Sequence, residues 1–196
     1  MDKRIAVVKR KTSETDISLT INIDGRGNSQ IDTGIGFLDH MLTLFAKHGL
    51  FDLKVKAKGD THVDMHHTVE DIGICLGEAF YQALGKRKGI RRYGLGYVPM
   101  DETLCRTVVD LSNRPYLIFN VKSPKPRRGD FDIGLTKEFL KALSNKGGIT
   151  LHVNLIYGEN GHHINEAIFK SLAIALDTAS VIDKRIIGLP STKGRL

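Results

Sequence analysis

The sequence predicts an α+β fold built from two copies of one half-domain, with helices covering one face of each sheet. Two observations predict it. The pattern His-His-x-x-Glu occurs at residues 66–70 and again at residues 162–166, and each copy opens an apolar stretch with helical spacing. The segments that precede each copy alternate apolar and polar residues, which is the pattern of half-buried strands.

The repeat extends beyond this pattern. Residues 13–32 align with residues 101–120 at an offset of 88, which sets Glu14 opposite Glu102. The His-His-x-x-Glu segments align at an offset of 96. We therefore expect a first half-domain at residues 1–90 and a second at residues 91–196, together forming one compact catalytic unit.

Between these segments, residues 37–57 align with residues 135–155 at an offset of 98, which sets His40 opposite Glu138. The offset grows because the second half carries a basic, Pro/Gly-punctuated insertion at residues 122–131, which we expect to be a loop.

Each half shows the same order of elements. In the first half, alternation over residues 16–24 predicts a strand, and residues 36–48 form a helical pattern that Gly49 ends. Residues 51–59 alternate again, and residues 64–84 form a long helix. In the second half, strands are expected at 106–111 and 116–121 and a long helix at 164–182, and we expect the strands that precede the first helix of each half to be antiparallel.

Composition excludes several classes of protein. No segment of the 196 residues has the roughly 18 consecutive apolar residues of a membrane span, and no export signal is evident. Cys75 and Cys105 lie in apolar segments without metal-knuckle spacing, so neither a disulfide framework nor a structural zinc site is expected. We expect a cytoplasmic protein. The net charge of +7 favours an anionic partner, which can be nucleic acid, a membrane surface or a phosphorylated metabolite.

The His-His-x-x-Glu helices are candidate metal sites. Residues four apart share one face of a helix, so His66 and Glu70 can converge on one ion, while His67 points about 100° away. His162, His163 and Glu166 repeat this geometry, which predicts two metals. The alternative is a capping or core role, but helix starts favour Ser, Thr, Asp and Asn over paired histidines. Imidazole and carboxylate donors suit Mn, Fe, Zn, Co or Ni.

Other polar residues complete a candidate site. His40 and Glu138 are the next candidate ligands because the repeat aligns them. Glu14 can serve as a general acid or base, although an exposed strand carboxylate is the equal alternative. Cations and tail hydroxyls suited to a phosphate are Arg92, Arg114, Lys170, Ser191, Thr192 and Lys193.

Six segments in this order resemble the imidazoleglycerol-phosphate dehydratase family: "GIGFLDHMLTLFAKHGLFDL", "HHTVEDIGICLGEAF", "RRYG…VPMDETL", "NRPYLIFN", "GENGHHINEAIFKSLAIAL" and "LPSTKG". The resemblance covers residues 9–194. It implies the ribosomal protein S5 domain 2-like topology in each half, and a manganese-dependent hydro-lyase that converts D-erythro-imidazole-glycerol phosphate to imidazole-acetol phosphate in histidine biosynthesis.

The resemblance further implies a 24-subunit homo-oligomer with active sites between subunits, two manganese ions per site, and no nucleic-acid or membrane partner. The ligands it implies are His40, His66, His67, Glu70, His162, His163 and Glu166, with Glu138 where some members carry His. The substrate contacts it implies are Glu14, His40, His48, Arg92, Arg114, Lys170, Ser191, Thr192 and Lys193, of which Glu14 and His48 are the catalytic candidates.

Two rival functions share parts of this pattern. A dinuclear metallohydrolase would use the same His and Glu ligands to hold a hydroxide nucleophile, but its Asp-rich ligand sets are absent. A basic RNA-binding protein would fit the charge and the S5-like topology, but aromatic residues make up only 7% of the chain and Trp is absent.

Overall fold

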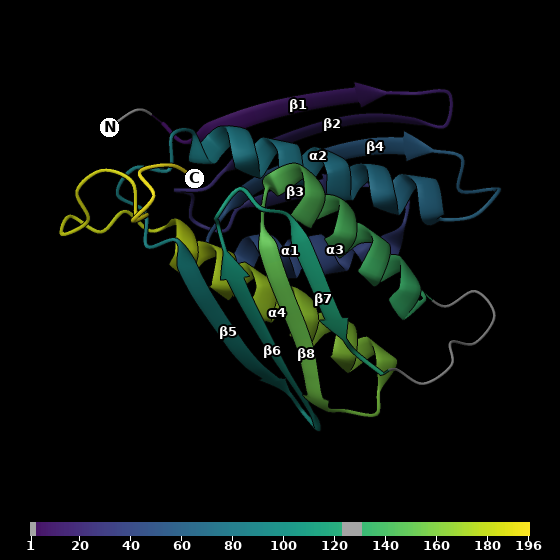
Figure 1. The fold of residues 1–196 in the computed structure, drawn as a ribbon. Coiled ribbons are helices and arrows are strands. Elements are labelled where there is room, and N and C mark those ends of the chain that lie inside the picture. The colour runs from purple at the N-terminus through teal and green to yellow at the C-terminus, as the bar shows by residue number, and fades with distance from the viewer. Residues whose placement is uncertain (1–2, 123–130) are drawn as a thin grey trace.

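The computed structural model describes residues 3–122 and 131–196, so the basic insertion predicted as a loop lies almost entirely outside the described residues. Two four-stranded sheets form the outer layers, and four helices lie between them (Figure 1). Each sheet is covered on one face by helices. This confirms the predicted α+β class and its two repeated half-domains, while the boundary between residues 90 and 91 stays a prediction.

The two halves have the same order of elements. The first half contains β1 (Ile5–Lys11), β2 (Thr15–Asn22), β3 (Ser29–Asp32), α1 (Gly36–His48), β4 (Asp52–Gly59) and α2 (His66–Leu84). The second contains β5 (Tyr93–Met100), β6 (Thr103–Asp110), β7 (Tyr116–Asn120), α3 (Ile133–Gly147), β8 (Thr150–Tyr157) and α4 (Gly161–Ser180). The sheet orders β1-β2-β4-β3 and β5-β6-β8-β7 correspond strand for strand.

The strands that precede the first helix of each half run antiparallel, as expected: β1 pairs antiparallel with β2, and β3 runs opposite to β2. β3 does not pair with β2, however: β3 pairs in parallel with β4, and β7 pairs in parallel with β8. The third strand of each half lies at the sheet edge beyond the fourth, because α1 or α3 carries the chain back across the sheet before that fourth strand forms. Among the named strands, the antiparallel pairs are β1 with β2, β2 with β4, and their repeat equivalents.

The helices pack across the two halves. α2 lies on β1 and β2 and against α3, while α4 lies on β5 and β6 and against α1. Two glycines let α2 approach α3 closely: a Cβ added to Gly73 would lie 2.6 Å from the carbonyl oxygen of Phe139, and one added to Gly77 would lie 2.7 Å from that of Leu143. This crossed packing brings α1 beside α4 and α3 beside α2, which places each half's shorter helix against the other half's His-His-x-x-Glu helix.

Both His-His-x-x-Glu segments open their helices. The side chain of Asp64 accepts a hydrogen bond from the backbone N–H of His66 at 2.7 Å, and Asn160 accepts one from His162 at 2.9 Å. In Figure 1 the first turns of α2 and α4 lie toward the right, whereas the C-terminal tail lies at the left beside the last turn of α4. Within residues 3–122 and 131–196, no helix is long and apolar enough to cross a membrane.

Candidate metal centres and substrate site

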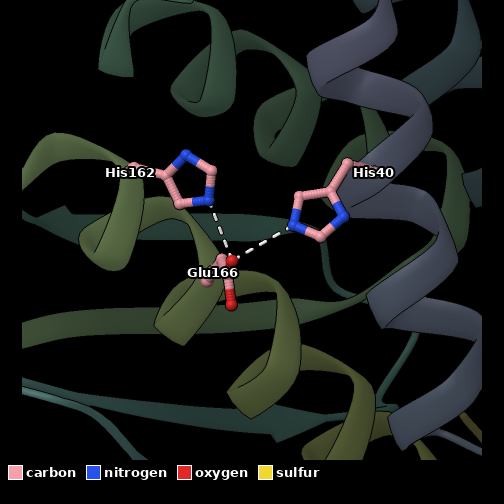
Figure 2. Close-up of side chains that lie close together, drawn as sticks. All are labelled: His40, His162 and Glu166. Carbon is pink, nitrogen blue, oxygen red and sulfur yellow. Dashed lines mark hydrogen bonds and ion pairs between the residues drawn. The ribbon is translucent and has the colours of Figure 1, made fainter.

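One candidate centre joins α1 to the start of α4. Figure 2 shows His40 and His162 converging on the carboxylate of Glu166. Oε1 of Glu166 lies 2.9 Å from Nε2 of His162 and 3.1 Å from Nε2 of His40. One donor atom from each of the three side chains lies within 4.8 Å of the others. A single cation can therefore contact all three donors after small side-chain shifts, and we call this the His40 centre.

The carboxylate of the His40 centre is ionised and already paired. Burial of Glu166 opposes its ionisation, but hydrogen bonds from Lys170, His40 and His162 outweigh this effect and lower its pKa to about 2. Nζ of Lys170 lies 2.6 Å from Oε2 of Glu166. His48, at the end of α1, is also influenced by Lys170. The burial of His48 lowers its pKa most, and the positive charge of Lys170 lowers it further.

The second candidate centre joins α3 to the start of α2. His66 and Glu70 are ligand candidates one turn apart on α2, with 3.8 Å between Nε2 and Oε2. His66 and Glu138 line one cavity of about 520 Å³ together with Asp64 and Asp132. We call this the Glu138 centre. It occupies the repeat position of the His40 centre but is more open.

The second histidine of each pair points away from its own centre. The rings of His66 and His67 lie at 90° to each other, and those of His162 and His163 at 88°. Divergence of the two rings is what the helical spacing predicts.

A carboxylate holds Nδ1 of each diverging ring. Nδ1 of His67 lies 3.0 Å from Asp60, and Nδ1 of His163 lies 2.6 Å from Glu102. These hydrogen bonds raise the pKa of both histidines, and that from His163 lowers the pKa of Glu102 to about 2. Nε2 of each ring is thereby directed outward, away from the carboxylate at Nδ1, as in a metal ligand oriented by a carboxylate. It lies 3.8 Å from Glu14 in His67 and 3.8 Å from Asp101 in His163.

Sequence reasoning missed Glu102 and Asp60. The signal for Glu102 was present, because the repeat sets it opposite Glu14, and Oε1 of Glu14 lies 3.8 Å from Nε2 of His67. Asp60 has no acidic repeat partner, since it follows β4 where Gly158 follows β8.

The cationic side chains predicted to bind phosphate lie in two separate places. Arg92 binds Asp110 through Nε at 2.7 Å, Arg114 approaches the same carboxylate at 3.6 Å, and Arg92 also donates to the carbonyl oxygen of Pro190 at 2.8 Å. The tail residues Ser191, Thr192 and Lys193 directly follow Pro190 in the sequence. Lys170 lies elsewhere, at Glu166. The role of Asp110 in holding both arginines gave no signal in the sequence.

The donor set fits a hard or borderline divalent cation. Each centre offers imidazole nitrogen and carboxylate oxygen, and both cysteines are buried away from them in the core. Manganese, iron and zinc accept such mixed ligands, whereas ions that prefer sulfur do not. Three side chains leave further coordination positions of such a cation open.

Comparison with known proteins decides between the functions that this donor set allows. A sequence model described as imidazoleglycerol-phosphate dehydratase matches residues 33–176. The chain belongs to the imidazoleglycerol-phosphate dehydratase family. The family's enzyme from Pelobacter propionicus is 60% identical over 193 residues, covering 98% of this chain and 99% of that protein.

Solved structures of the imidazoleglycerol-phosphate dehydratase family share the fold. The crystal structure from Staphylococcus aureus has a TM-score of 0.82 and 42% identity, covering 91% of this chain and 99% of that one. The structure from Pyrococcus furiosus, in complex with (S)-C348, has a TM-score of 0.84 and 39% identity, covering 96% and 100%. The predicted family, its dehydratase activity and its place in histidine biosynthesis are confirmed.

Proposed function

We propose that the chain dehydrates D-erythro-imidazole-glycerol phosphate to imidazole-acetol phosphate and water with two manganese ions per active site. We further propose a cytoplasmic homo-oligomer of 24 subunits with active sites between subunits. The observation that carries the proposal is the convergence of His40, His162 and Glu166 from two helices on one point, in a chain of this family.

The two centres would hold one ion each. His40, His162 and Glu166 would bind one, His66, Glu70 and Glu138 the other. His67 and His163 would supply further ligands to the centres of a neighbouring copy, which their outward Nε2 atoms support. When bound, the ions would supply Lewis-acid polarisation and orientation of the substrate's imidazole ring.

The separation of the substrate groups supports a site between subunits. Arg92 donates its backbone N–H to the carbonyl oxygen of Ala179, near the end of α4. Lys170 lies nine residues earlier on that helix, which is about 13 Å along the axis. This separation exceeds the length of the substrate's three-carbon chain. We infer that Arg92, Arg114 and the tail residues Ser191, Thr192 and Lys193 of one copy bind the phosphate of a substrate whose ring lies at another copy's centres.

The chain's own residues would move the protons. Dehydration removes the hydroxyl group from the carbon beside the ring, with a proton added to it so that it leaves as water, and removes a proton from the next carbon of the chain, which gives the enol of the product. Glu14 presents a half-exposed carboxylate beside Nε2 of His67 and can accept the carbon-bound proton. His48 and Lys170, which are close enough for the charge of Lys170 to lower the pKa of His48, can hold the hydroxyl group and donate a proton to it.

An assay of imidazole-acetol phosphate formation tests the proposal. Protein freed of metal by chelation should be inactive, and manganese should restore turnover. Turnover that is equal before and after chelation, with no metal bound, would refute the metal-dependent part. Absence of product with manganese present would refute the function.

A further inference from the structure

The two candidate centres are built on equivalent positions of the repeat, so their differences can be compared residue by residue. His66 and Glu70 of α2 correspond to His162 and Glu166 of α4. The donor set would therefore be the same at these positions. Among the neighbouring positions that differ, we compare four at which the charge changes.

Two differences lie on the helices that face the ion. Glu138 on α3 stands where α1 carries His40, so one centre has a second carboxylate where the other has an imidazole. Ile74 on α2 stands where α4 carries Lys170. Only the His40 centre therefore contains a cation bonded to its glutamate, at 2.6 Å.

The other two differences lie at the helix starts. Asp64 lies one residue before the N-cap of α2, and Asn160 is the N-cap of α4; each accepts a hydrogen bond from the backbone of the first histidine. We call these two residues the caps, and they differ by one negative charge. Asp132 caps α3 and lines the cavity of the Glu138 centre, while Gly34 holds the equivalent place before α1.

The differences all act in one direction. The Glu138 centre gathers four carboxylates, on Asp64, Glu70, Asp132 and Glu138. The His40 centre has one, on Glu166, and Lys170 neutralises it. The Glu138 centre has a counter-charge too, Lys141 at 3.2 Å from Glu138, but the side chain of Lys141 is 56% exposed and that of Lys170 only 14%. Solvent screens the first pair far more than the second.

We propose that the Glu138 centre binds its divalent cation first and more tightly, so that the protein passes through a state with one cation per active site before the His40 centre fills. This inference rests on the proposed two-metal function. It adds an order of loading, and it assigns Lys170 a second role as the residue that weakens cation binding at the His40 centre.

The most direct test exchanges the two caps, because neither is a proposed ligand and Asp and Asn form the same hydrogen bond. Manganese is titrated into the chelated full-length protein, and free manganese is followed by electron paramagnetic resonance. The unmodified protein should show two classes of site. Asp64→Asn should weaken the tight class by about threefold, and Asn160→Asp should strengthen the weak class by a similar factor, both effects shrinking at high salt.

A second pair of variants exchanges the residues at positions 170 and 74, of which only Lys170 carries a charge. Lys170→Ile should tighten the weak class by about tenfold, and Ile74→Lys, which places an ammonium group one turn from Glu70, should loosen the tight class. Each variant is compared with the unmodified protein in circular dichroism and oligomer size, so that a folding defect is recognised and the conservative cap variants then decide.

The outcomes separate this inference from the proposed function. A single class of two equal sites, or a tight class that responds to residue 160 instead of residue 64, would overturn the inference even if the enzyme is active. Two unequal classes that respond as predicted, in a protein that forms no imidazole-acetol phosphate, would support the inference and overturn the proposed function.

Discussion

Oε2 of Glu102 lies 2.6 Å from Nδ1 of His163. The repeat equivalents, Glu14 and His67, are arranged differently: Glu14 faces Nε2 of His67 at 3.8 Å, and Asp60 has taken over the bond to Nδ1. One half thus uses the repeated glutamate to fix a histidine ring, while the other half leaves it free for chemistry. Substitutions at the two positions should therefore have different effects.

Glu14→Gln should lower kcat about 100-fold or more while leaving bound manganese unchanged, because the amide cannot accept a proton. Steady-state kinetics and metal analysis of the same sample measure both quantities. Unchanged kcat would remove Glu14 from proton transfer.

Glu102→Gln should instead lower manganese affinity by about tenfold or more, because His163 loses the carboxylate that orients its ring and raises its basicity. Asp60→Asn should do the same through His67. Metal titration of both variants provides the measurement. Manganese affinity equal to that of the unmodified protein would show that the outward histidines are not ligands.

Arg114→Ala should raise KM about tenfold with a smaller change in kcat, because a charge-assisted contact to phosphate contributes about 1.5–3 kcal/mol. The matched control is Arg106→Ala, which removes an exposed cation from the same sheet without touching the Asp110 cluster. If the two variants raise KM equally, Arg114 contributes only to the net positive charge of the protein and makes no specific contact with the phosphate.

Gly73→Ala should destabilise the protein by about 1–3 kcal/mol, because its Cβ would lie 2.6 Å from the carbonyl oxygen of Phe139 and push α2 from α3. Gly36→Ala is the control, since a Cβ there has no atom within 4 Å and the residue lies in the first turn of α1. Urea unfolding of the two variants measures the difference, and equal stabilities would contradict the close approach of the helices.

Asp52→Asn tests the dependence of stability on pH. Backbone hydrogen bonds from Arg26 and Asn28 lower the pKa of Asp52 below its ordinary value of 3.8. A lowered pKa in the folded state means that the carboxylate stabilises the fold above pH 3.8, and that this contribution disappears as pH falls through the folded-state pKa. The variant should have a lower Tm than the unmodified protein at pH 7, and the difference should shrink below pH 3.8. A Tm difference that is constant across this range would contradict the assignment.

The sequence carried more information about the fold than about the site. Strand alternation and helical spacing act within one element, so β2, α1, α2 and their repeats could be predicted closely. The parallel pairing of β3 with β4 could not, because a short edge strand shows the same alternation in either direction.

The site depends on contacts between elements. The pairing of Lys170 with Glu166 follows a spacing of four residues and could have been read from the helix. The contact of Asp110 with Arg92 joins the end of β6 to the residue before β5, and that of Asp60 with His67 depends on how the β4–α2 connection folds back. Neither contact leaves a pattern in the sequence.

The central claim is that two metal centres, one from each repeat, must both be filled for turnover. Reactivation of the chelated protein with measured amounts of manganese tests it directly, with bound manganese per chain and imidazole-acetol phosphate formation followed together. The account predicts that turnover rises mainly as the second ion binds and is complete at two ions per chain. Full turnover with one ion bound per chain, or with none, would contradict it.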